Sequence, residues 1–218
     1  MDYITKDDTI IFSPNYNDVL DINLLSKYAK LIFSDNALSD KLFEAYENNN
    51  IDYFQSYQGS KFNQKINNLP TSLTHLRFGF YFNQKVNNLP QNLTHLTFGN
   101  RFNQEVNNLP QNLRYLTFGY YFNQFVDYLP SNIVEITFCY EFNQKIENLP
   151  ISIQKIIFST HSDYNIELNC LPNFLEFLQL PEKYDKKILN LPKELKTIKC
   201  SKNYEYLNDF AGYDVEYY

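Results

Sequence analysis

Residues Leu93–Asn112 read L-T-H-L-T-F-G-N-R-F-N-Q-E-V-N-N-L-P-Q-N, and variants of this unit recur along the chain. The Phe-Asn-Gln triplet of the unit begins at residues 62, 82, 102, 122 and 142, an unbroken spacing of 20 residues. A fixed period of 20 to 50 residues is typical of solenoids and repeat arrays. The period therefore predicts a stacked coil in which each repeat forms one turn.

The unit carries signals for one strand, one turn and an extended return. Leu96-Thr97-Phe98 alternates apolar and polar side chains, which indicates a short strand. Gly99 follows it and permits a positive φ where the chain leaves the strand. Pro110 donates no backbone N–H, so Leu109-Pro110 indicates a polyproline-like return rather than a central strand. We expect short parallel strands, few helices and six inward side chains, namely Leu93, Leu96, Phe98, Phe102, Val106 and Leu109.

The pattern weakens toward both ends of the 218 residues. Residues 61–206 are interpreted as 20-residue repeats, and residues 1–60 as degenerate N-terminal turns or a cap with one short helix. Within residues 1–60, Phe12, Tyr16 and Asn17 match the offsets of the repeat, Tyr28–Phe33 reads as a strand, and Ser39–Asn48 reads as the helix. Residues 207–218 are interpreted as an acidic, aromatic C-terminal tail.

Charge and cysteine content exclude several classes of protein. The net charge is −6, although residues 181–202 hold seven Lys against three acidic residues. No broad basic face is evident, so we expect neither nucleic-acid binding nor, without a long apolar run, a membrane span. The three cysteines, Cys139, Cys170 and Cys200, lack metal spacing, and no signal peptide is evident. A cytoplasmic protein is expected, and a nuclear one fits equally well.

The Asn of each triplet has a structural interpretation. A coil corner leaves backbone N–H and C=O groups without strand partners, and a buried amide side chain can bond them and those of the next turn. Six Asn residues occupy this place and are called the Asn ladder: Asn63, Asn83, Asn103, Asn123, Asn143 and Asn165.

Other places in the repeat vary freely and predict where a partner binds. Alternate side chains of a strand face away from the core, and a variable face on a fixed scaffold is how repeat proteins present binding sites. Tyr and Arg are also enriched at interface hot spots. The alternative is that these aromatic side chains only shield the edge of the core. The candidate partner-binding residues are Phe80, Tyr81, Arg101, Tyr120, Tyr121, His75, His95 and Tyr115.

No motif for catalysis is present. The chain has no Gly-rich phosphate loop, no nucleophile elbow and no paired catalytic carboxylates. His75 and His95 are expected side by side on adjacent strands, but zinc needs at least three protein ligands. We therefore expect no enzyme, no cofactor and no metal site.

The pattern Phe-Asn-Gln-x-Val/Ile-x-x-Leu-Pro-x-x-Leu-x-x-Leu-x-Phe-Gly resembles the FNIP repeat over residues 62–158, and more weakly to about residue 206. That family is similar to leucine-rich repeats and occurs chiefly in social amoebae and in giant viruses of amoebae. The resemblance implies a curved solenoid with its strands on the concave face. Some members carry an N-terminal F-box, which implies a substrate adaptor of a ubiquitin ligase, whereas residues 1–60 lack the Leu-Pro opening of that motif.

Three functions follow from this sequence. The first is a non-enzymatic, monomeric scaffold that binds a protein partner, which would be a host protein if the chain is viral. The second is a ubiquitin-ligase adaptor that acts through residues 1–60. The third is a structural protein that assembles through its end turns.

Overall fold

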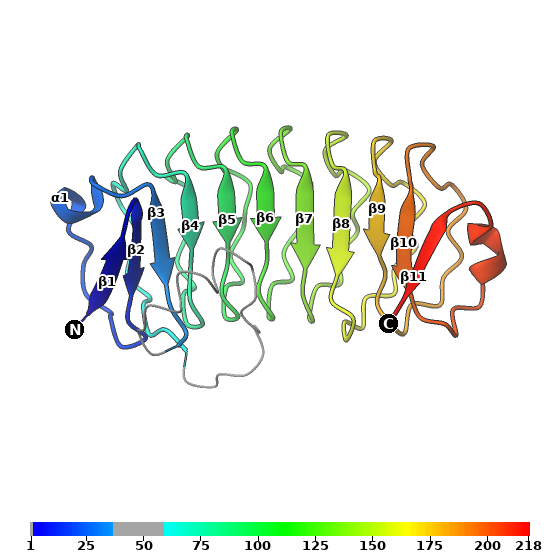
Figure 1. Cartoon of the computed structure of the whole chain (residues 1–218), viewed down its shortest axis with the longest axis horizontal. Helices are drawn as coiled ribbons and strands as arrows, with labels where there is room; N and C mark the ends of the chain where they lie inside the picture. The colour runs from blue at the N-terminus through cyan, green and yellow to red at the C-terminus, as the bar shows by residue number, and fades with distance from the viewer. Residues whose placement is uncertain (1, 37–58) are drawn as a thin grey trace.

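The computed structural model describes residues 2–36 and 59–218, which form one elongated β-solenoid of about nine turns (Figure 1). A single sheet holds 11 strands in the order in which they occur in the chain. β1 pairs with β2 in the antiparallel sense, and every later pair is parallel. The strands are β1 (Tyr3–Lys6), β2 (Thr9–Phe12), β3 (Lys30–Phe33), β4 (His75–Arg77), β5 (His95–Thr97), β6 (Tyr115–Thr117), β7 (Glu135–Phe138), β8 (Lys155–Phe158), β9 (Phe177–Gln179), β10 (Thr197–Cys200) and β11 (Asp214–Tyr217).

Helix is scarce, as the sequence predicts. The one-turn helix α1 (Ile22–Leu25) is capped by Asp21, whose side chain accepts a hydrogen bond from the Asn23 N–H, and the 3-10 turn η1 (Leu207–Phe210) lies near the C-terminus. The predicted helix Ser39–Asn48 lies outside the described residues. Among the residues that are described, no helix has the length and apolar character that a membrane span requires.

The core consists of the residues that the repeat predicts. β4 and β5 each bury their middle residue and leave its two neighbours half-exposed, as in His95-Leu96-Thr97. Leu76, Leu96 and Leu116 are in register across β4, β5 and β6. All six predicted inward side chains of the unit Leu93–Asn112 are at most 4% exposed. The alternate residues of the strand and the spaced apolar residues of the return segment therefore form one continuous core.

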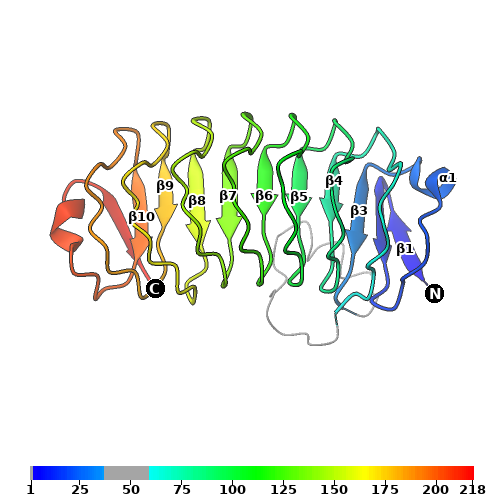
Figure 2. The same cartoon turned by 180° about the vertical axis from the view of Figure 1, so that it is seen from behind.

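Phe side chains form two stacked columns inside the coil. Successive rings of the triplet column are 6.2 Å apart between Phe82 and Phe102 and 6.1 Å apart between Phe102 and Phe122. Parallel strands are only about 4.8 Å apart. Because equivalent atoms lie farther apart inside the coil than in the sheet, the turns fan out behind the strands, and the strands lie on the concave side. Figure 2 shows the strand-free return segments on the opposite side.

The glycine at the strand exit is required by a close approach rather than by a positive φ. In the described residues, Gly212 is the glycine with a positive φ, so Gly99 does not use the positive φ that a glycine permits. A Cβ atom on Gly99 would instead lie 1.9 Å from the carbonyl oxygen of Gly79. Where Cys139 and Ser159 replace this glycine, β7 and β8 continue to Phe138 and Phe158, one residue farther than the strands before them.

Both ends extend the same coil. Residues 9–36 supply β2, β3 and the turn between them, in which Tyr16 stacks on Phe62 with ring centroids 6.1 Å apart. The β1–β2 hairpin before this turn is not evident from the repeat pattern. At the other end, residues 207–218 were expected as a tail but include η1 and β11, which pairs with β10. Aromatic and apolar residues of this segment, such as Phe210, close the last turn of the core.

Candidate functional site

The Asn ladder lies at the surface of the coil, next to the strand-exit edge. The Oδ1 atom of Asn83 accepts a hydrogen bond from the backbone N–H of Asn103 at 2.9 Å, and the same bond joins each pair of successive turns from Asn17 to Asn143. Asn165 Oδ1 accepts the same kind of bond from the backbone N–H of Asp185, and Asn165 Nδ2 donates to the Asp185 carboxylate. The expectation that these amides are buried is wrong, because the backbone they bond runs along the outside of the corner. Asn63, Asn103 and Asn143 are exposed.

The Gln of the triplet completes the ladder. Gln104 Nε2 donates to Asn83 Oδ1 at 3.1 Å, and Gln124 Nε2 donates to Asn103 Oδ1 at 2.9 Å. Each ladder oxygen in these turns therefore accepts two hydrogen bonds from the next turn. This role of Gln was not predicted from the sequence, although the recurrence of Gln directly after Asn in all five triplets was the available signal.

A groove lies between the Asn ladder and the variable residues that follow each strand. It encloses about 580 Å³. This exit groove, as we call it, brings together three of the predicted partner-binding residues with three ladder residues. Its lining consists of Asn63, Tyr81, Asn83, Arg101, Asn103 and Tyr121.

Arg101 lies at the centre of the exit groove. Its guanidinium carbon is 5.1 Å from the centre of the Tyr121 ring and 6.0 Å from that of Tyr81, within the range of cation–π attraction. Tyr81 and Tyr121 are 39% and 41% exposed. Within residues 2–36 and 59–218, no carboxylate lies within ion-pair distance of Arg101. The two tyrosine rings therefore hold at the surface a guanidinium group that forms no ion pair within the described residues.

Phe80 and Tyr120 support the exit groove from the side. Phe80 packs edge-on against Tyr81, and Tyr120 packs in the same way against Tyr121, each pair with ring centroids 4.8 Å apart. Both Phe80 and Tyr120 are half-buried and are not among the lining residues. The backbone N–H of Phe80 also donates to the carboxylate of Asp35 at 2.7 Å.

Asp35 is a half-buried acid with a structural role. Its Oδ1 atom accepts from the backbone N–H groups of Ser60 and Phe80, both at 2.7 Å, and so joins the turn after β3 to the first regular repeats. Burial raises the pKa of this carboxyl, and the two N–H donors counteract the rise. Because both donors are backbone groups that hold the turns together, this acid fits a structural role better than catalysis.

His75, His95 and Tyr115 lie apart from the exit groove, where β4, β5 and β6 begin on the open face of the sheet. The rings of His75 and His95 stack with centroids 3.9 Å apart, and His95 stacks on Tyr115 at 4.3 Å. Thr74 and Thr94 contact the two Nδ1 atoms at 2.8 and 2.9 Å. Burial, together with the neighbouring His75, lowers the pKa of His95 to about 4. The predicted side-by-side pair is therefore part of a neutral aromatic stack at neutral pH.

The column continues with charged residues on the next strands. Lys155 Nζ lies 3.4 Å from Glu135 Oε2 and 5.4 Å from the centre of the Phe177 ring. The sheet face therefore satisfies most of its polar groups internally. Across the described residues, no three His, Cys, Asp or Glu side chains gather as metal ligands would.

The lysine cluster of residues 181–202 is largely neutralised by the chain itself. Lys187 pairs with Asp209 of the final turn at 3.3 Å, and Lys196 pairs with Glu176 at 2.6 Å. Lys199 lies over the ring of Tyr218, whose hydroxyl donates to the Leu180 carbonyl. Acidic and aromatic side chains of the protein itself thus contact the lysines that an anionic partner would otherwise bind.

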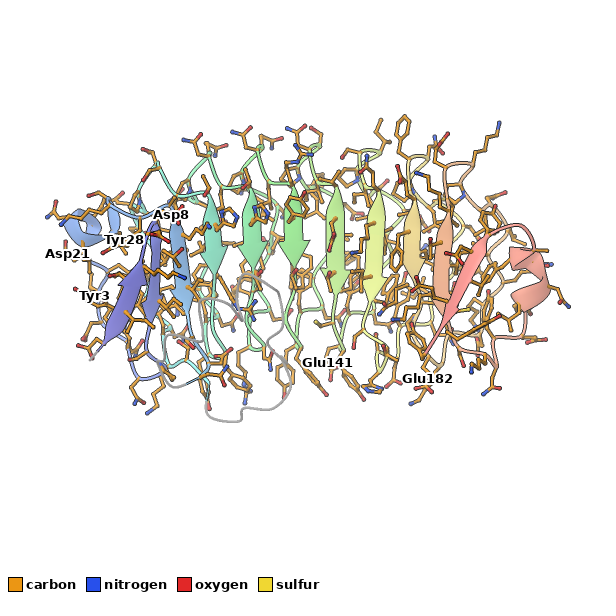
Figure 3. All side chains as sticks on the ribbon, viewed as in Figure 1. Tyr3, Asp8, Asp21, Tyr28, Glu141 and Glu182 are labelled. Carbon is orange, nitrogen blue, oxygen red and sulfur yellow. The ribbon has the colours of Figure 1, made fainter. Side chains whose placement is uncertain are left out.

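A second hollow of about 820 Å³ runs along the opposite edge of the sheet, where the strands begin. Its walls are mainly Ser, Thr and Asn side chains, several of which already bond neighbouring turns. Asn92 Nδ2 donates to the Thr71 carbonyl and Asn132 Nδ2 to the Gln111 carbonyl, both at 2.8 Å. Figure 3 labels Glu141 at the strand-exit edge. Glu141 occupies the place that follows Tyr121 at the 20-residue spacing. The second hollow also contains Arg114. In the exit groove, however, the rings of Tyr81 and Tyr121 hold Arg101 in place, so the exit groove is the better candidate site.

The single parallel sheet, the stacked core and the strand-free return define a β-solenoid of the leucine-rich-repeat kind. The FNIP Repeat family matches residues 62–100, 82–108, 102–140, 125–161 and 142–183. These matches span residues 62–183, more than half of the chain, and the chain belongs to the FNIP repeat family.

A solved structure supports the fold. The crystal structure described as CroV588, a novel circular LRR protein structure, comes from a giant virus and aligns with a TM-score of 0.50 and 28% sequence identity. The alignment covers 94% of this chain and 38% of that chain. No curated protein sequence matches significantly. Solenoids of this kind are typical scaffolds for protein interaction.

Proposed function

We propose that this protein is a non-enzymatic scaffold that binds a protein partner through the strand-exit edge of β4, β5 and β6. The observation that carries the proposal is the exit groove, in which Arg101 lies between Tyr81 and Tyr121 above the Asn ladder. The residues that line it come from three successive turns, so the rigid coil fixes their relative positions. The likeness to a giant-virus protein supports a viral factor acting on a host protein as the finer form of this proposal.

The composition of the exit groove supports binding rather than structural shielding. Tyr and Arg are the residue types that dominate interface hot spots, where truncation of a central residue costs about 2 kcal/mol or more. Shielding needs apolar contact with the core, whereas Phe82, Phe102 and Phe122 already fill the core beneath these positions. The exposed tyrosine rings and the open guanidinium therefore exceed what packing requires.

Affinity capture from a host-cell lysate tests the proposal. The bait is the wild-type chain, and the test variant carries Tyr81→Ala, Arg101→Ala and Tyr121→Ala. The matched control carries Phe125→Ala and Tyr128→Ala, which remove exposed aromatic side chains outside the exit groove. We expect the control to retain a partner that the triple variant loses, with unchanged melting temperatures. A partner retained by the triple variant and lost by the control would overturn the proposal.

The two other functions have less support. The adaptor function depends on a helical module in residues 1–60, and residues 2–36 form strands and coil turns with the single short helix α1. Self-assembly would use the edge strands β1 and β11. Asp214 and Glu216 of β11, and Asp2 and Asp7 of the hairpin at the opposite end of the coil, place acidic side chains at both edges of the sheet, which favours a monomer.

A further inference from the structure

The spacing of the turns at the exit groove matches an extended peptide. The ladder residues Asn63, Asn83 and Asn103 each directly follow a stacked Phe, and these Phe rings repeat every 6.1–6.2 Å. Side chains on one face of a β-strand repeat about every 6.6–6.8 Å. Polyproline II repeats its positions about every 9.3 Å and matches neither one turn nor two. Alternate side chains of an extended segment therefore meet successive turns.

The Asn ladder distinguishes an extended peptide from a helix. The Oδ1 atoms of Asn63, Asn83 and Asn103 are occupied by the next turn, and no hydrogen bond of the described residues uses their Nδ2 atoms. The floor of the exit groove thus presents a row of amide donors at the same spacing. An extended segment has backbone carbonyls free to accept from them, whereas the carbonyls of a helix are already bonded internally.

The charge of this part of the coil selects an acidic segment. Residues 59–104 contain five basic residues and no acidic one, although the whole chain has a net charge of −6; the five are Lys61, Lys65, Arg77, Lys85 and Arg101. In the column beside the ladder, Lys61, Tyr81, Arg101 and Tyr121 alternate cation and aromatic ring. A strand that alternates acidic and apolar residues at every second position complements this column.

We infer that the exit groove binds an extended acidic peptide segment of a partner protein. Acidic side chains of the segment pair with Lys61 and Arg101, apolar side chains lie on Tyr81 and Tyr121, and backbone carbonyls accept from the Asn ladder. The inference rests on the proposed function and names its partner class.

Fluorescence anisotropy with labelled peptides tests this inference on the full chain. The first probe is Glu-Ser-Leu-Ser-Glu-Ser-Leu, in which Glu and Leu alternate at every second position. A second has the same composition with Glu and Leu adjacent, a third has Lys in place of Glu, and a single-stranded oligonucleotide is the fourth. The proteins are wild type, Arg101→Glu and the control Phe125→Ala, each checked for an unchanged melting temperature.

The alternating acidic probe is expected to bind wild type and Phe125→Ala at least about tenfold more tightly than the other three probes. Arg101→Glu should lose this binding and prefer the Lys probe, and added salt should weaken the wild-type complex. Equal affinity for the acidic and Lys probes, no binding of any peptide, or preferred binding of the oligonucleotide would overturn the inference. If the capture experiment still shows a partner that depends on Tyr81, Arg101 and Tyr121, the proposed function stands and only the peptide class fails.

Discussion

The Oδ1 atom of Asn103 accepts two hydrogen bonds from the following turn, one from the backbone N–H of Asn123 at 3.0 Å and one from Gln124 Nε2 at 2.9 Å. Its own backbone N–H donates to Asn83 one turn earlier. The backbone and the side chain of this one residue thereby join three successive turns at the corner of the coil. The same arrangement leaves its amide donors facing the exit groove, so stability and the candidate site share this residue.

Replacing Asn103 with Ala should lower the free energy of unfolding by about 1 kcal/mol. Two hydrogen bonds are lost, each with a net contribution of about 0.5–1.5 kcal/mol, and water can partly replace them because the side chain is exposed. Asn103→Asp keeps the acceptor oxygen and is the matched control, with a smaller loss expected. Urea unfolding followed by circular dichroism measures both. Equal stability of the Ala variant and wild type would show that the ladder is not stabilising.

Replacing Gly99 with Ala should destabilise the coil more strongly, by about 1–3 kcal/mol or more. The added Cβ would lie 1.9 Å from the Gly79 carbonyl oxygen, so two turns must separate. Ser159→Ala is the control at the equivalent place of a later turn, where a Cβ is already accommodated, and its effect should stay within about 0.5 kcal/mol. Thermal unfolding compares the two variants. A Gly99→Ala protein that melts at the wild-type temperature contradicts the close approach.

The His stack predicts a loss of stability in mild acid. The pKa of His95 is about 4 in the folded chain, whereas the pKa of a His side chain in an unfolded chain is about 6.5. Between these values the unfolded chain binds more protons, so stability falls as the pH drops from about 6.5 to about 4. Lys30 and Arg114 disfavour the charged form further, and neighbouring Tyr115 supplies no counter-charge at these pH values.

His95→Phe retains a ring for the stack and removes the titration. Its melting temperature should therefore fall less steeply than that of wild type between pH 6.5 and 4, with any carboxylate contribution common to both proteins. Thermal melts at closely spaced pH values make the comparison. Parallel curves for the two proteins would argue that His95 is not held neutral by the fold.

Thiol reactivity should separate the three cysteines. Cys170 is exposed, whereas burial raises the pKa of Cys139 to about 12 and that of Cys200 to about 11. Because the thiolate is the reactive form, one thiol should react rapidly with a disulfide reagent at pH 8 in the native chain, and all three after denaturation. Cys170→Ser should abolish the rapid phase. Rapid reaction of a second thiol would contradict the burial of Cys139 or Cys200.

The sequence predicts the parts of this fold that depend on one turn alone. The period, the strand around Leu96 and the inward Phe102 follow from local alternation and recurrence. Interactions between turns are harder to predict from the sequence, because they depend on how closely the backbones of successive turns approach one another. The contact of Gly99 with Gly79 and the exposure of the Asn ladder are of this kind.

The candidate site likewise has one part that the sequence predicts and one part that it does not. The column containing Tyr81, Arg101 and Tyr121 follows from the variable places of the repeat, whereas the groove between that column and the ladder does not. His75 and His95 share the variability of that column but lie at the other end of the strands, in a stack of their own. Sequence variation identifies exposed columns, and only the coil geometry shows which of them enclose a groove.

Site-specific photo-cross-linking tests the central claim most directly. A benzophenone amino acid replaces Tyr121 in one protein and Phe125 in a second, and each is irradiated with the partner or with the alternating acidic peptide. Position 121 lines the exit groove, whereas position 125 is 66% exposed outside it. The account predicts a covalent adduct from position 121 that excess unlabelled peptide suppresses, and little from position 125. Adducts from position 125 alone, or equally from both positions, would contradict it.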